Sequence, residues 1–120
     1  MSIDRTTYLI YGYKIEDEKG IDSFDEHYEE LFETEPYSKM FNNVNSDQTI
    51  VCDQMCGNYV YIGIQIAKLD YEDDASLEID HDKLNELDGR LNEYMNHWPD
   101  YVLEIVKNKR RNLFCFVHIY

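Results

Sequence analysis

The sequence predicts an α+β domain in which a four-stranded antiparallel sheet carries two helices on one face. Four segments are rich in β-branched and aromatic residues, as strands are. Two segments between them repeat apolar residues at helical spacing. The 120 residues are enough for one domain with a buried core, so we assign residues 1–120 to a single domain.

The first strand and the first helix follow one another near the N-terminus. Residues 6–15, TTYLIYGYKI, have strand composition. Ser23 followed by Glu26 is a capping-box pattern and predicts a helix start. The apolar stripe of this helix is expected to be Phe24, Tyr28, Leu31 and Phe32. Pro36 is expected to end the helix, and residues 37–47 are expected to form a polar loop.

A hairpin and a second helix are predicted next. The segments TIVCDQMC (49–56) and YVYIGIQIAKL (59–69) read as strands, and Gly57-Asn58 between them is a tight-turn dipeptide. An acidic connection follows, and Asp80 at its end is placed to cap a helix. The apolar stripe of that helix is expected to be Leu84, Leu87, Leu91, Tyr94, Met95 and Trp98.

The last part of the chain supplies the fourth strand. Residues 100–107, DYVLEIVK, fit a short helix or a strand, and the preceding Pro99 favours the helix. The basic run KNKRR then turns the chain, and NLFCFVHIY (112–120) forms the final strand. The order strand, helix, strand, strand, helix, strand is the split βαβ pattern of a ferredoxin-like fold.

Alternation along the strands predicts what each side of the sheet carries. The side beneath the helices is expected to hold Val60, Ile62, Ile64 and Ile66 of the third strand and Leu113, Cys115, Val117 and Ile119 of the fourth. The opposite side gathers Tyr59, Tyr61, Phe114, Phe116, His118 and Tyr120. An open aromatic face is unusual on a monomer. We therefore predict an interface there, covered by a second copy, another partner or the 100–107 segment.

The chain is strongly acidic, with 25 acidic and 11 basic residues and a net charge of −14. Such a field repels nucleic acid and anionic membranes. Ten acids lie within 16–35 and nine within 70–88, and each zone has one lysine. If both helices pack on the same side of the sheet, these acids form one negative surface. We predict that it binds a basic partner through Asp25, Glu26, Glu29, Glu30, Glu33, Asp73, Asp74 and Glu86. The alternative is that the charge only maintains solubility.

No motif in the sequence predicts catalysis or a bound cofactor. A G-x-S-x-G elbow and a phosphate-binding glycine loop are both missing. Asp53, within an apolar strand, is the one candidate for a buried acid of raised pKa, although an outward-facing strand residue is the simpler interpretation. The acid clusters at 70–74 and 80–82 lack the spacing of a calcium loop, and no histidine pair has zinc-ligand spacing. We expect neither an enzyme nor a specific metal site.

Cysteine use and hydropathy predict a cytoplasmic protein. The odd set Cys52, Cys56 and Cys115 indicates reduced thiols. The N-terminal MSIDRTTYLIYGY lacks the apolar centre of a signal peptide. No segment approaches the run of about 20 apolar residues that a membrane span needs.

Two resemblances bear on function. The aromatic strands GNYVYIGI and RRNLFCFV are loosely similar to those of RNA-recognition modules, but the basic-Gly-aromatic signature is missing and the charge opposes phosphate, so we predict no direct nucleic-acid binding. In size, acidity and its 11 tyrosines, the whole chain resembles small phage-encoded early proteins. Some of these inhibit host nucleases, glycosylases or CRISPR effectors by presenting carboxylates where phosphates would sit.

The resemblance to phage proteins implies a non-enzymatic inhibitor that binds a basic, nucleic-acid-binding partner. The alternative prediction is a homodimer that binds a small ligand at its aromatic sheet interface. An enzyme is a third option, and it would require a closed apolar pocket with a buried acid such as Asp53.

Overall fold

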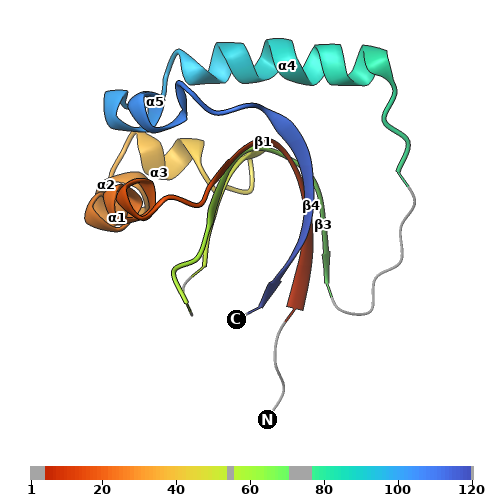
Figure 1. The fold of residues 1–120 in the computed structure, drawn as a ribbon. Coiled ribbons are helices and arrows are strands. Elements are labelled where there is room, and N and C mark those ends of the chain that lie inside the picture. The colour runs from red at the N-terminus through yellow and green to blue at the C-terminus, as the bar shows by residue number, and fades with distance from the viewer. Residues whose placement is uncertain (1–4, 54–55, 71–76, 120) are drawn as a thin grey trace.

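The computed structural model describes residues 5–53, 56–70 and 77–119. The described chain forms four strands and five helices. In chain order these are β1 (Arg5–Ile15), α1 (Glu18–Glu26), α2 (Tyr28–Glu33), α3 (Tyr37–Met40), β2 (Gln48–Cys52), β3 (Val60–Asp70), α4 (His81–Met95), α5 (Asp100–Val106) and β4 (Asn112–Ile119). Figure 1 shows the helices on the outer side of a strongly curved sheet.

The four strands form one antiparallel sheet in the order β2-β3-β1-β4. The prediction of an α+β fold with a four-stranded antiparallel sheet is therefore confirmed. Each helical connection joins two strands that a third strand separates: β3 lies between β1 and β2, and β1 lies between β3 and β4. The helical layer differs from the prediction, because the described chain has five helices where two main helices and, as one alternative, a short third at 100–107 were expected.

The helical segment after β1 begins before its capping-box pattern. The carboxylate of Asp17 accepts a hydrogen bond from the amide of Gly20 (2.8 Å) and caps α1. Ser23 therefore lies inside α1, and the prediction that it starts the helix is wrong. Aspartate caps as well as serine does, so the earlier cap adds helical hydrogen bonds that the later start would lose. The helix breaks at His27, and Tyr28 after the break is 42% exposed rather than part of the buried stripe.

Other local predictions have mixed outcomes. Asp80 caps α4 as predicted, by accepting a hydrogen bond from an amide of the first turn (2.8 Å). The helix alternative for residues 100–107 is confirmed by α5. The loop expected at 37–47 contains the short helix α3, and β2 ends at Cys52 rather than at residue 56.

The sheet bends between Tyr8 and Lys14 of β1, a stretch that holds one of a pair of facing glycines and a register shift between Leu9 and Ile10. Gly12 of β1 and Gly63 of β3 are direct partners in the strand register. A Cβ atom on Gly12 would lie 2.1 Å from the carbonyl oxygen of Ile62. A Cβ atom on Gly63 would lie 2.3 Å from the carbonyl oxygen of Tyr11. Each backbone thus occupies the space that the other residue's side chain would need, so only glycine fits. Figure 1 shows the resulting arch in β1, β3 and β4.

Aromatic rings join the two arms of the arch on its concave side. In the register, Tyr61 is opposite Lys14 and Phe116 is opposite Tyr8. Lys14 and Tyr8 are separated by about 20 Å in a flat strand, yet the rings of Tyr61 and Phe116 stack with centroids 3.7 Å apart. We call the residues that meet there the concave cluster: Tyr8, Tyr59, Tyr61, Phe114, Phe116 and His118. The aromatic residues therefore cover one another.

The main core lies between the outer side of the sheet and the helices. Val60, Ile62 and Ile64 are buried there, as predicted. Cys115 and Val117 were expected in the same layer, but they are exposed, Val117 by 53%. Figure 1 shows the reason: α1, α2, α3 and α5 gather beside one arm of the arch, whereas β4 runs down the other arm.

We predict that Gly63→Ala lowers the free energy of unfolding by about 1–3 kcal/mol or more, because the new Cβ must displace the backbone of β1. Gly89→Ala is the matched control: Gly89 lies inside α4 with open space around it, so alanine should stabilise by up to about 1 kcal/mol. Urea unfolding monitored by circular dichroism measures both variants. Equal effects of the two substitutions would contradict the role of the glycine pair.

Candidate functional site

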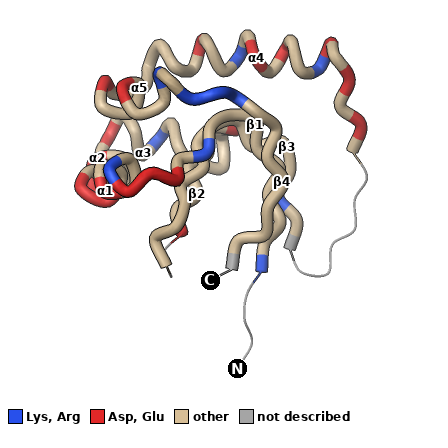
Figure 2. Tube along the Cα trace, in the orientation of Figure 1, with Lys and Arg blue, Asp and Glu red and all other residues tan. Residues whose placement is uncertain are grey.

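The acidic residues of α1 and α2 form one exposed row. We call it the acidic stripe: Glu18, Asp22, Asp25, Glu26, Glu29 and Glu33. Its members recur every three to four residues, so they share one face of the helical segment. The opposite face is buried through Ile21, Phe24 and Leu31. At the helical rise per residue, the stripe spans roughly 20 Å. Figure 2 shows α1 and α2, with their acidic positions in red, at one end of the molecule.

Within the described chain, no member of the acidic stripe forms an ion pair. The ion pairs there use other acids, namely Glu16, Asp17, Glu35, Asp47, Glu86, Asp88 and Glu104. Lys19 is the one base within α1 and α2, and it is exposed. The charge of the stripe is therefore left to solvent or to a partner.

Four of the predicted partner-binding acids lie in the stripe: Asp25, Glu26, Glu29 and Glu33. The prediction missed Glu18 and Asp22, because it placed the start of the helix at Ser23. An aspartate followed by glutamate in the first turn is a helix-start signal that would have found them.

The second predicted acidic zone does not join the stripe. Figure 1 shows α4 running along the top of the arch, away from α1 and α2. Glu86 on α4 lies between two bases, 3.8 Å from Lys83 and 3.9 Å from Arg90. The single negative surface expected from both helices is therefore wrong for the described residues, because the two helical connections contact different parts of the sheet. Asp73 and Asp74 lie outside the described residues.

Glu30 belongs to the packing of α2 rather than to the stripe. It is half-buried near Tyr101 of α5. Burial, and secondly the nearby Glu30 carboxylate, raise the pKa of Tyr101 to about 12. The imidazole of His27 stacks on the same ring with centroids 3.8 Å apart. Charge reversal at Glu30 would therefore disturb the core as well as the surface.

The concave cluster is mostly closed to solvent. Tyr61 is 6% exposed and His118 is 7% exposed, while Tyr59, Phe114 and Phe116 are half-buried. The Tyr59 hydroxyl and Nδ1 of His118 form a hydrogen bond of 2.9 Å. Burial lowers the pKa of His118, and burial with the nearby Asp53 carboxylate raises the pKa of Tyr59. Tyr120 lies outside the described residues.

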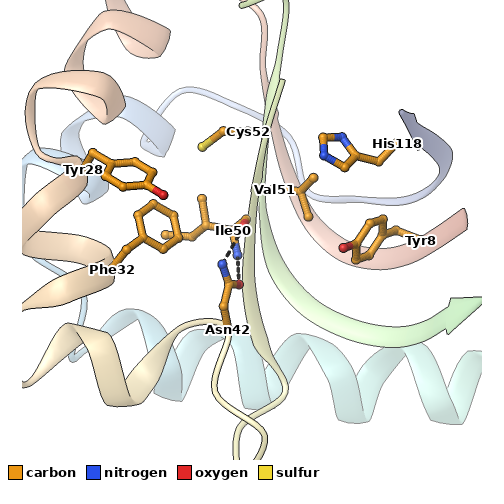
Figure 3. Close-up of a pocket in the computed structure, with 8 residues that line it drawn as sticks. All are labelled: Tyr8, Tyr28, Phe32, Asn42, Ile50, Val51, Cys52 and His118. Atoms are coloured by element: carbon orange, nitrogen blue, oxygen red, sulfur yellow. Dashed lines mark hydrogen bonds between the residues drawn. The ribbon is translucent and has the colours of Figure 1, made fainter. Parts of the chain in front are cut away.

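A pocket of about 270 Å³ wraps around the free edge of β2 (Figure 3). Tyr28, Phe32 and Cys52 line it on the helix side of the strand, and Tyr8, Val51 and His118 line it on the concave side. Its polar atoms do not form a catalytic pair, because β2 separates Cys52 from His118. Burial raises the pKa of the Cys52 thiol to about 12, so the thiolate needed for nucleophilic attack is scarce at neutral pH.

Asp53 holds the turn between β2 and β3. Its carboxylate accepts hydrogen bonds from the amides of Cys56 (3.2 Å) and Asn58 (3.1 Å). Its own amide donates to the carbonyl oxygen of Tyr59 (3.0 Å). The Asp53 carboxylate is thus engaged by two amide donors of the turn. The prediction that Asp53 lies inside a strand is wrong, since β2 ends one residue earlier.

No group of three or more histidine, cysteine or acidic side chains in the described part could hold a metal ion. No helix there has the length and apolar content to cross a bilayer. Neither a family model, nor a curated protein, nor a solved structure matches the chain.

We predict that His118 makes folding pH-dependent. The unfolded imidazole has a pKa of about 6.5, and burial lowers the pKa of the folded one. Below the unfolded pKa, the unfolded chain binds a proton that the folded chain does not, so stability is lost as the pH falls. Between about pH 7.5 and about pH 5.5, the urea midpoint of the natural chain should fall further than that of His118→Gln. His97→Gln, at an exposed histidine, is the control and should follow the natural chain. Parallel pH profiles for His118→Gln and the natural chain would contradict this role.

Proposed function

We propose that the chain is a non-enzymatic binding protein that docks its acidic stripe on a basic surface of another protein. The observation that carries the proposal is the row of six exposed carboxylates without an internal ion pair in the described chain. The nucleic-acid-binding face of a protein is the basic surface that such a row fits best, because it is built to receive phosphates along a line. This agrees with the resemblance to phage-encoded inhibitors.

The cost of the stripe supports a binding role over simple solubility. Like charges three or four residues apart destabilise a helix by about 0.2–0.5 kcal/mol per pair. The stripe contains several such pairs, for example Asp22 with Glu26 and Glu29 with Glu33. Acids scattered over the surface would keep the chain soluble without this cost. A basic partner would convert the repulsion into steered, salt-dependent association.

The fold proposal that accompanies this function is a ferredoxin-like domain. Its support is the split arrangement, in which a third strand separates the two strands of each strand–helix–strand unit. Within that scheme, α1, α2 and α3 replace the first single helix, and α4 with α5 replaces the second.

Two features of the site favour a non-enzymatic role: Asp53 is engaged in a turn, and the strand β2 separates Cys52 from His118.

The alternative, a homodimer binding a small ligand at the aromatic face, has less support. The rings that would form that interface already pack against each other across the arch, as Tyr61 and Phe116 do. Little apolar area is therefore left on the concave side for a second copy or a ligand.

We predict that Glu26, Glu29 and Glu33 changed together to lysine weaken binding to basic nucleic-acid-binding domains by about tenfold or more. The control changes Glu78, Glu93 and Glu104 to lysine, which alters the net charge equally at exposed acids outside the stripe. The probes are purified basic nucleic-acid-binding domains of bacterial origin, with oligolysine as the non-specific baseline, measured by interferometry across a salt series. Equal losses in both variants, or binding that ignores salt, would contradict docking through the stripe.

A further inference from the structure

The two edges of the sheet are protected differently. At the β2 edge, the side-chain amide of Asn42 donates to the carbonyl oxygen of Ile50 (2.9 Å) and accepts from its amide (2.8 Å). The backbone amide of Asn42 donates to the carbonyl oxygen of Gln48 (2.9 Å), and the Ser46 hydroxyl accepts from the Gln48 amide (3.1 Å). Figure 3 shows Asn42 bonded along the strand at Ile50. Asn42 thus occupies the place of a neighbouring strand and blocks this edge.

The outward row of β4 follows from the strand register. The backbone amide and carbonyl of Ile50 point away from β3, so its neighbours on β2 bond to β3. In antiparallel pairing, the backbone groups of successive residues point alternately to the strands on either side. This alternation can be followed through the registers of β3, β1 and β4. On β4 the outward amides and carbonyls then belong to Leu113, Cys115, Val117 and Ile119. The Leu113 amide bonds to the side-chain oxygen of Asn112 (2.8 Å), as expected for a group that does not face β1. In the described part of the chain, no backbone group bonds to the outward side of Cys115 or Val117.

The side chains of β4 are those of an interior strand. The half-buried Phe114 and Phe116 lie on the concave side, and Cys115 and Val117 are exposed on the outer side. Strands that are apolar on both faces are normally buried on both faces, whereas the outer face of β4 is open at Cys115 and Val117. Natural edge strands carry lysine, proline or a bulge as protection. β4 has none of these over Asn112–Ile119, and it pairs with β1 without a register shift.

We propose that the outer edge of β4 pairs with β4 of a second copy of this chain. The two strands run antiparallel about a two-fold axis near Cys115, within the outward row. Each β4 then becomes an interior strand of one sheet that continues through both copies. Such an isologous contact is self-complementary, because the same row of amides and carbonyls faces itself.

Charge restricts where a second copy can dock. Two chains of net charge −14 repel each other over most of their surface. The strand β4 is uncharged, and near its start Lys107, Lys109 and Arg111 are each paired with an acid. Figure 2 shows the acidic stripe at a different end of the molecule from the free end of β4. Pairing through β4 therefore brings together strands that contain no Asp, Glu, Lys or Arg and keeps the two stripes apart.

Sedimentation and light scattering from micromolar to submillimolar concentration test the proposal. The natural chain is expected to reach twice its monomer mass, and raised salt should leave the dimer unchanged or strengthen it. Val117→Lys places a charge within the contact, two residues from its axis, and should raise the dimer dissociation constant about tenfold or more. Val44→Lys is the matched control, since Val44 is 98% exposed and lies in the loop before β2. Circular dichroism verifies that both variants are folded.

Two further variants test the register. Cys115→Pro removes one outward amide without breaking the bonds to β1, so it should also abolish the dimer. In a Cys56→Ser background, a short thiol cross-linker should join Cys115 to Cys115 of the second copy, because directly opposed Cβ atoms lie about 5 Å apart. A natural chain that stays monomeric at every concentration overturns the proposal. A dimer that tolerates both Val117→Lys and Cys115→Pro, and does not cross-link, also overturns it and indicates another interface. Neither outcome affects the acidic stripe, whose test measures binding to basic domains.

Discussion

The structure depends on the close approach of two backbones at Gly12 and Gly63, where neither strand leaves room for a side chain. This approach lets a small antiparallel sheet fold over instead of only twisting. The aromatic rings of the two arms then meet, with Tyr61 stacked on Phe116 and Tyr59 bonded to His118. A chain of this size has a limited core, and the bend adds a second apolar layer on the concave side, where a flat two-layer domain would expose its rings to water.

The bend also decides where the chain can meet other molecules. It closes the concave face, so the surfaces left for partners are the outer helices and the strand edges. Of the two helical connections, one carries unpaired acids on α1 and α2, while the other places Glu86 between bases on α4. Of the two edges, Asn42 blocks β2, while on β4 the outward amides of Cys115 and Val117 have no backbone partner in the described chain. The same arm that lacks a helical cover exposes Val117 on β4, so the open edge and the exposed apolar residues coincide.

Sequence patterns predicted what is local and missed what is set by the bend. The strands β1, β3 and β4 followed from their β-branched and aromatic residues, and Asp80 followed from its position before an apolar stripe. Gly12 and Gly63 are unremarkable within strand-like runs, because their role exists only when the two are opposite each other. For that reason the closure of the aromatic face and the exposure of Cys115 were not predictable from alternation. The acids of α1 and α2 were found in part, because exposure on a helix is a local property, whereas the separation of α4 from them depends on where each connection crosses the sheet.

The acidic stripe and the β4 edge are separate features, yet together they would shape how the protein acts. A monomer presents one stripe of roughly 20 Å, which limits it to one basic surface at a time. Pairing through β4 would hold two stripes in one particle with a fixed spacing. A partner with two basic surfaces, or two subunits, would then gain affinity from the second contact only if its own spacing matched that of the stripes. Binding through the stripe needs no dimer, but selection among basic partners, which share the same charge, would come from this geometric match rather than from charge.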